Sequence, residues 1–380
     1  MRQQVDKYLA KLIRHGLVSD EADAALYGLD DEISTNRARV EPEVSAIFSL
    51  LNINSLIVAR PERTLHRVVE RLVEDASGPI RPRDCESLTF FHDIPVVPSL
   101  EPGIVAAALK GRKGCIVRGT GLVTIGTVSL EQAFITLSSI CFACFVKFFT
   151  DAISGLAGRE GASPLTPRWK AECLEILELT RPRPAVLAGP SARPETETGI
   201  VRAMDAAGRA VVEAGLVDSF FGNISWRAGQ EIFISQTGSS LDELPGYIDR
   251  VPLDGSSTCG ITSSSELMAH IATYELTGDE AIVHGHPRYS VIMSMAEGPL
   301  EFGRTRFVGG VPVVAGEVGA GSRGLVHTLP QAMQERHCAI VSGHGTFTSS
   351  KGSFEPALER LSAIELMCHQ RCRDLIAGTG

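Results

Sequence analysis

Apolar residues follow helical spacing in some segments of the second half of the chain and strand spacing in others. Helical spacing covers residues 200–214, just before Gly215, and residues 354–376, with Pro356 in the first turn. Serine caps predict another helix at residues 263–275. Strands are predicted at residues 223–226, 231–235, 281–283, 311–315 and 338–342. This alternation predicts a layered α/β domain.

The length of 380 residues predicts more than one domain. A stretch rich in proline, glycine and arginine, residues 181–198, has the composition of a linker. We therefore expect a first module at residues 1–180 and a second at residues 199–380.

The two modules resemble each other in sequence. Residues 115–121 align with residues 339–345 at an offset of 224, the difference between positions 344 and 120. Residues 57–61 align with residues 282–287 if one gap is allowed. Such self-similarity predicts duplication of one module.

His284, His286 and His344 of the second module have no histidine counterparts in the first. At the aligned positions the first module has Ala59, Arg60 and Thr120. Glu43 is the candidate counterpart of Glu266, and we interpret it as a structural or surface carboxylate. We expect metal binding in the second module only.

His284 and His286 stand two positions apart after an apolar run, and His344 stands between two glycines. Side chains at positions i and i+2 of a strand project to the same face, so both imidazoles can reach one cation. Any one of them alone is more typical of a hydrogen-bonded histidine. Together, three imidazoles with one open position favour a catalytic divalent metal over a structural zinc site.

Charge and cysteine content narrow the class of protein. The chain has 36 basic against 45 acidic residues, a net charge of −9, which argues against a nucleic-acid partner. The apolar run at residues 133–149 is interrupted by polar residues, so we expect no membrane span and no membrane partner. Nine cysteines without a disulfide-like spacing favour a cytoplasmic protein, and we interpret Cys141 and Cys144 as core residues.

Ordered motifs of the second module resemble the class II aldolase/adducin family, which includes fuculose-phosphate aldolase. The motifs are Gly222-Asn223-Ile224-Ser225, Ile234-Ser235-Gln236-Thr237-Gly238, Ser264-Ser265-Glu266, His284-Gly285-His286-Pro287 and Gly343-His344-Gly345. The resemblance implies a three-layer α/β/α fold with a central, mainly antiparallel sheet, present here as two tandem copies.

The same resemblance implies the site and its chemistry. The three histidines would bind a divalent metal, zinc first and manganese or cobalt as alternatives, and Glu266 would be the acid/base carboxylate. Residues that would surround a substrate phosphate are Asn223, Thr237, Gly238, Ser264 and Ser265. His270 lies four residues after Glu266 on the same helical face. Two roles for His270 are equally compatible with this position: it orients a neighbouring site residue, or it packs in the core.

The expected function is an aldolase-type lyase acting on a small phosphorylated keto sugar or hydroxy-ketone. Breaking a carbon–carbon bond beside a carbonyl leaves an enediolate, whose charge a metal stabilises. Alternatives are a sugar-phosphate epimerase, a 3-oxo acid phosphate decarboxylase and a non-catalytic adducin-like assembly protein. Family members typically form fourfold rings, so we expect a homo-oligomer, with a dimer of tandem chains as a pseudo-fourfold ring.

Overall fold

The protein forms two compact units in a computed structural model that describes residues 1–74, 76–188, 193–217, 220–254, 256, 262–319 and 321–379. The units are Met1–Phe149 and Thr150–Gly380, so the division falls earlier than the expected boundary at residue 180. The reason is that helix α7 (Pro167–Leu179) packs on the C-terminal helix α12 (Glu355–Ala377). Lys170 Nζ, for example, donates to the carbonyl of Ala377 at 2.9 Å.

The second unit is built on an eight-stranded sheet with the order β11-β12-β13-β14-β10-β7-β8-β9. Neighbouring strands are antiparallel except for β12 and β13. The strands are β7 (Asn223–Ala228), β8 (Glu231–Ser235), β9 (Ile248–Pro252), β10 (Ala281–Gly285), β11 (Thr305–Val308), β12 (Val311–Val314), β13 (Cys338–Val341) and β14 (Gly345–Ser350). The other helices are α8 (Glu197–Glu213), α9 (Leu267–Thr277), α10 (Arg288–Met295), η3 (Leu325–His327) and α11 (Leu329–Met333).

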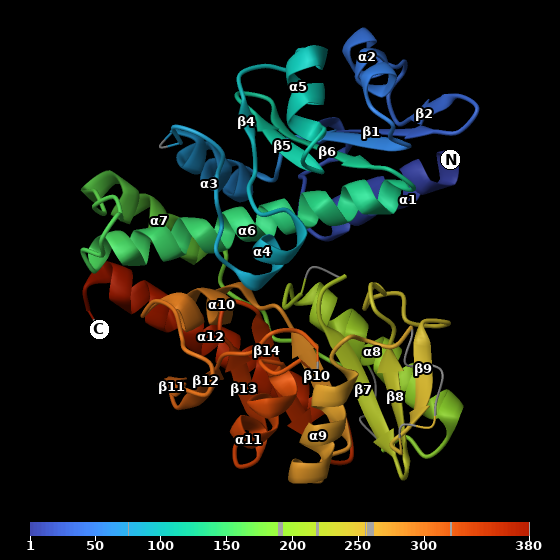
Figure 1. The fold of residues 1–380 in the computed structure, drawn as a ribbon, viewed down its shortest axis with the longest axis vertical. Coiled ribbons are helices and arrows are strands. Elements are labelled where there is room, and N and C mark those ends of the chain that lie inside the picture. Colours follow the sequence, from blue (N-terminus) through green and yellow to red (C-terminus); the bar gives the residue numbers. More distant parts are fainter. Residues whose placement is uncertain are drawn as a thin grey trace. The chain divides into compact units, whose positions relative to one another are not determined.

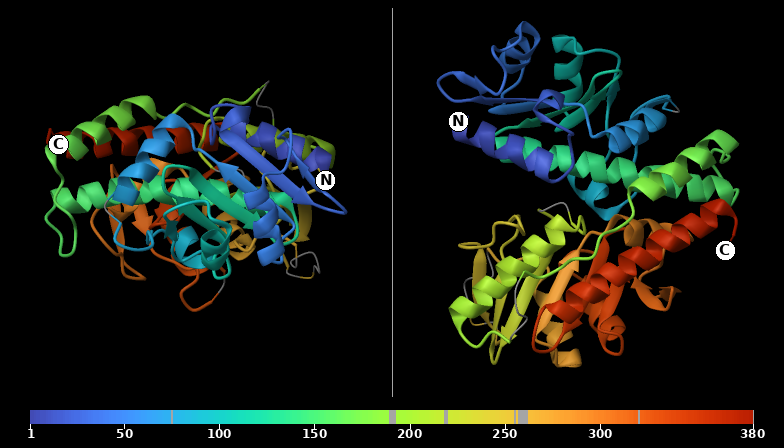
Figure 2. Two further views of the ribbon diagram at one scale, coloured as in Figure 1. Left: turned by 90° about the horizontal axis from the view of Figure 1, so that it is seen from above. Right: turned by 180° about the vertical axis from the view of Figure 1, so that it is seen from behind.

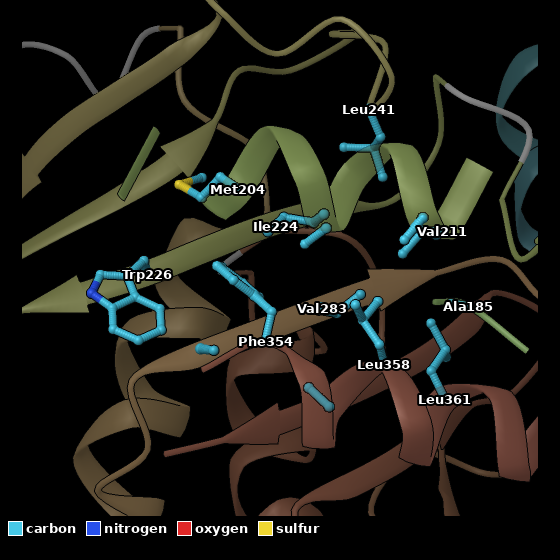
Figure 3. Packing of buried hydrophobic residues seen from close by; sticks show 14 of the residues in the cluster. Ala185, Met204, Val211, Ile224, Trp226, Leu241, Val283, Phe354, Leu358 and Leu361 are labelled. Carbon is cyan, nitrogen blue, oxygen red and sulfur yellow. The ribbon is translucent and has the colours of Figure 1, made fainter. Parts of the chain in front are cut away.

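Helices cover both faces of this sheet. Figure 1 shows α9 and α11 on one face, and the rear view in Figure 2 shows α8 and α12 on the other. Successive side chains of a strand point to opposite faces of the sheet, so the sheet separates two hydrophobic clusters. Ala281 and Val283 pack with α8 and α12, whereas Ile282 packs with α9 and α11. Figure 3 shows the first cluster, in which Trp226 of β7 lies beside Phe354, the N-cap residue of α12, with ring centroids 5.5 Å apart. The expected α/β/α layers and mainly antiparallel sheet are confirmed.

The expected helices and strands of this unit are present, with one shifted start. Helix α9 begins at Leu267 rather than at residue 263. Ser263 is instead extended and forms a β-bridge with Gln236, and Glu266 is the N-cap residue. Serines can cap a helix from several positions, so the sequence pattern alone could not locate this start.

The first unit has a six-stranded sheet with the order β2-β1-β3-β6-β5-β4. Its strands are β1 (Ala24–Leu29), β2 (Ile33–Thr35), β3 (Ser55–Ala59), β4 (Val96–Val97), β5 (Gly114–Val117) and β6 (Gly121–Gly126). Its helical elements are α1 (Arg2–Arg14), η1 (Glu21–Asp23), α2 (Pro42–Leu50), α3 (Arg63–Glu74), α4 (Cys85–Phe90), α5 (Pro102–Leu109) and α6 (Leu130–Leu156), which continues past Phe149.

The two sheets have the same connectivity. The order β4-β5-β6-β3-β1-β2 repeats as β12-β13-β14-β10-β7-β8, and in each sheet the first pair is parallel and the others antiparallel. Side-chain contacts repeat as well. The hydroxyl of Thr124 donates to the Ala133 carbonyl at 2.8 Å, and that of Thr348 donates to the Ala357 carbonyl at 2.9 Å. The topology therefore supports duplication of one module.

Strand register corrects the sequence alignment of the two modules. Pairing of β3 with β6, and of β10 with β14, aligns the units without the gap that placed Ala59 at a histidine position. An inserted residue would need a bulge, and these ladders are continuous. The residues of the first unit at the positions of the three histidines are Val58, Arg60 and Thr120.

Glu41 rather than Glu43 occupies the position of Glu266. Glu41 is the N-cap residue of α2, as Glu266 is of α9. Its carboxylate accepts a hydrogen bond from the Tyr27 hydroxyl. Glu43 is exposed in the first turn of α2, as expected of a surface carboxylate.

Helix α6 contains the apolar run of the first half. Its 27 residues meet the length and hydropathy criteria for a membrane span, but 83% of its most apolar 18-residue window is buried in the fold. Cys141 and Cys144 are both completely buried on this helix. Burial raises the pKa of the Cys144 thiol, which disfavours the reactive thiolate. These features are typical of a core helix.

Candidate metal centre

The three histidines converge at one end of the second sheet. His284 lies near the end of β10, His286 follows that strand, and His344 lies in the turn between β13 and β14. The ligand atoms of all three lie within 4.8 Å of one another, and the Nε2 atoms of His284 and His286 are 3.1 Å apart. Each residue is at most 3% exposed. The expected same-face projection of His284 and His286 is confirmed.

The protonation state of these imidazoles suits metal binding. Burial lowers the pKa of His284 to about 3 and that of His344 to about 4, and it lowers the pKa of His286 as well. Nδ1 of His284 donates to the Thr346 carbonyl at 3.2 Å, which leaves the Nε2 lone pair facing the other two rings. Three neutral nitrogen donors facing one point fit zinc, or another divalent transition metal such as cobalt.

Glu266 lies beside the same point. Its Oε2 is 3.5 Å from Nε2 of His284, and its Oε1 is 3.6 Å from Nε2 of His344. Glu266 makes no side-chain cap to α9, although it is the N-cap residue. Asn223 Nδ2 donates to Oε2 at 2.6 Å instead. The Glu266 carboxyl group therefore faces the histidines rather than capping α9, and its acid/base role stays a prediction.

The environment of Glu266 favours a protonated carboxyl. It is 4% exposed, and burial raises its pKa, although His344 and the hydrogen bond from Asn223 act in the opposite direction. A raised pKa makes a buried carboxyl group hold its proton more readily than an exposed glutamate does.

His270 belongs to a buried polar network behind the histidines. Its Nδ1 lies 2.7 Å from Ser225 Oγ, which is in turn 2.7 Å from the Tyr274 hydroxyl. Phe347 separates His270 from the centre, since its ring stacks on His284 with centroids 3.7 Å apart. His270 is thus both packed and hydrogen-bonded, one layer behind the ligands.

Of the residues expected around a phosphate, Asn223 and Ser264 contact Glu266, and several donors of the set are engaged within the protein. Thr237 and Gly238 follow β8 and are exposed, as is Ser265, whereas Ser264 is buried. The Thr237 hydroxyl donates to the Ser263 carbonyl at 2.9 Å. The side-chain amide of Asn223 donates to Glu266, as described above. Phosphate binding at these residues stays a prediction.

The structure adds supporting residues that the motifs did not identify. Ser290 Oγ accepts from Thr346 Oγ1 at 2.9 Å, and Ser294 Oγ accepts from the backbone N–H of Gly343 at 2.9 Å. Both serines lie on α10, directly after the histidine pair. Their four-residue spacing, which puts them on one helical face, is the signal that could have found them.

Gly345 leaves no room for a side chain between the ligands. An added Cβ would lie 2.4 Å from the Gly285 carbonyl oxygen and 2.7 Å from Cε1 of His284. We expect Gly345→Ala to weaken zinc binding about 10- to 100-fold, since displaced ligands bind less well. Competition with a chromophoric chelator measures this affinity. The control is Gly321→Ala, where an added Cβ meets no described atom within 4 Å; equal affinities in both variants would contradict the expectation.

Comparison with known proteins finds a family model that matches the second unit and two relatives that each match part of this chain. Residues 202–372 match the model of the Class II Aldolase and Adducin N-terminal domain. The chain is 29% identical over 195 residues to a 3,4-dihydroxyphthalate decarboxylase of Arthrobacter keyseri, covering 46% of this chain and 78% of that protein. It is 26% identical over 189 residues to the enzyme of the same name from Terrabacter sp. (strain DBF63), covering 45% and 79%.

Solved structures include a similar protein. The l-fuculose-1-phosphate aldolase from Thermus thermophilus is 26% identical, with a TM-score of 0.38, and the match covers 47% of this chain and 93% of the aldolase. The match to the aldolase and the matches to the two decarboxylases each cover about half of this chain.

Proposed function

We propose that this chain, whose residues 202–372 form a class II aldolase and adducin domain, is a metal-dependent carbon–carbon lyase. One observation carries the proposal: three buried imidazoles face one point, and a buried carboxyl group lies 3.5–3.6 Å from two of them. A bound divalent cation would supply Lewis-acid stabilisation of negative charge on adjacent substrate oxygens. Zinc fits the three nitrogen donors best.

Each residue of the site has a separate role in this proposal. His284, His286 and His344 would hold the cation, and the Thr346 carbonyl keeps His284 in the tautomer that leaves Nε2 free. Glu266 moves the proton. Asn223 holds the Glu266 carboxyl group in place through its 2.6 Å hydrogen bond.

We propose decarboxylation as the reaction, on an acid that carries two adjacent oxygens next to the carboxylate. The bond to the carboxylate carbon breaks, carbon dioxide leaves, and the electron pair remains on the substrate carbon and its conjugated oxygens. Glu266 then delivers its proton to that carbon, which balances charge and atoms. The two curated relatives support this choice, since 3,4-dihydroxyphthalate by its name has adjacent hydroxyls and carboxylates on one ring.

The surroundings of Glu266 support a substrate without a phosphate group. The Asn223 amide and the Thr237 hydroxyl, two donors expected to bind phosphate, are committed to protein acceptors. The Asp249 carboxylate accepts hydrogen bonds from Gln236 at 2.7 Å and from Ser263 at 2.9 Å, on both segments that would surround the anion. Fewer donors are therefore left for the oxygens of a phosphate group. The proposal differs here from the phosphorylated keto sugar expected from sequence.

The test measures carbon dioxide and aldehyde release by the zinc-loaded chain, before and after chelation and after zinc is restored. The substrates are 3,4-dihydroxyphthalate, related hydroxy acids and a panel of ketose phosphates. We expect metal-dependent carbon dioxide release from a hydroxy acid. Aldehyde release from a ketose phosphate would instead establish an aldolase. Bound zinc without either product would favour epimerisation, and a chain that binds no metal would favour an assembly protein.

A further inference from the structure

A buried carboxylate on the C-terminal helix holds the start of α10. Oε1 of Glu365 accepts from the backbone N–H of Tyr289, and Oε2 accepts from that of Ser290, each at 2.8 Å. Glu365 lies on α12 and is 3% exposed. The first N–H groups of a helix have no partners within the helix, and the two oxygens of Glu365 serve two of them. Glu365 therefore fixes the position of α10.

Helix α10 in turn contacts the segments that carry the ligands. It begins at Arg288, one residue after Pro287, so its first turn directly continues the segment of His286. Ser290 Oγ accepts from Thr346 Oγ1, and the Thr346 carbonyl is the acceptor for Nδ1 of His284.

The third ligand is supported by the next turn of the same helix. Ser294 Oγ accepts from the backbone N–H of Gly343, the residue before His344. Ser294 Oγ itself donates to the Val291 carbonyl at 2.7 Å, which orients its lone pairs. All three ligand segments are thus connected to α10.

The first unit, which lacks the ligands, also lacks this support. The Thr124 and Thr348 contacts align α6 with α12, and this alignment places Cys141 at the position of Glu365. The backbone N–H of Thr64, near the start of α3, is bonded at 2.9 Å by the nearby Glu62 instead of by a distant helix. The carboxylate on the last helix of the module occurs together with the histidines.

We propose that Glu365 is a positioning residue that sets the affinity and geometry of the three-histidine metal centre through α10. It touches neither the ligand atoms nor a substrate. Loss of a hydrogen-bond partner behind the ligands of a metal site costs roughly 10- to 100-fold in affinity, and Glu365 acts on the segments of all three ligands. The inference rests on the metal centre of the proposed function and is independent of the reaction.

The test compares zinc affinity and cobalt spectra of the full chain and of Glu365→Gln. A glutamine keeps the size of the side chain, but its single acceptor oxygen can serve only one of the two N–H groups. We expect zinc to bind about 10-fold more weakly, measured by competition with a chromophoric chelator. The visible absorption of bound cobalt, which reports ligand geometry, should shift. Glu359→Gln, an exposed carboxylate on the same helix, should bind zinc within about twofold of the parent chain.

Three outcomes would count against the positioning role or replace the test variant. Equal zinc affinity and identical cobalt spectra in the parent chain and Glu365→Gln would overturn the positioning role, even if the variant unfolds more easily. Absence of zinc binding in the parent chain would overturn the metal centre, and this inference with it. If Glu365→Gln does not fold, Ser294→Ala removes the link to Gly343, together with the hydrogen bond to Val291, and the same two measurements apply.

Discussion

The His284→Ala chain should bind zinc on the order of a thousandfold more weakly than the parent chain and should lose turnover. Structural zinc sites bind with about 10–16 kcal/mol from four ligands, so that one ligand is worth roughly two to three factors of ten. His284 is central among the three, since its Nε2 lies 3.1 Å from that of His286 and 3.5 Å from Glu266 Oε2. Metal analysis of the purified parent chain should find about one ion per chain.

The matched control is His327→Ala. His327 is exposed in the same unit, and its Nε2 lies 3.1 Å from the Gly321 carbonyl. This variant should retain zinc and activity. An active His284→Ala chain without metal would refute the metal centre, and two ions per parent chain would refute the loss of metal binding in the first unit.

Glu266→Gln should reduce turnover by about two to four factors of ten while zinc binding stays within about tenfold of the parent chain. A glutamine has nearly the same shape, and its oxygen can still accept the hydrogen bond from Asn223, but it cannot release or take a proton. The split between the two measurements is the expected signature, because Glu266 lies beside the three histidines without being one of the ligands.

Glu275→Gln is the control for this variant, since Glu275 is exposed on the same helix α9. It should leave turnover and zinc affinity unchanged. If Glu266→Gln lost zinc and activity in the same proportion, the carboxylate would be a ligand. If it kept full activity, another group would move the proton.

The convergence of the three histidines could be predicted from sequence because local geometry decides the direction of their side chains. Two histidines at positions i and i+2 after an apolar strand must face the same side, and a histidine between two glycines needs a tight turn. The sequence position of Glu266 alone favours a helix cap, since a carboxylate near a helix start is usually one. Its place beside the histidines could be predicted only because the family motif accompanies it.

The supporting residues could not be predicted in this way. Glu365 is one of several charged residues on a long helix, and nothing near it in sequence indicates that it bonds to α10. The predicted gap in the repeat alignment was wrong for a similar reason. An alignment of a few similar residues permits an insertion, whereas a continuous pair of strands does not. Tertiary contacts settle both questions.

The two threonine contacts that recur in both units have a consequence for how the chain evolved. Thr124 and Thr348 bond to the last helix of their modules in the same way, while the residues around the histidines have diverged. A contact that both halves share, such as this one, identifies what the common architecture uses. If the second half is catalytic as proposed, contacts found there alone are the ones to test for a part in its chemistry.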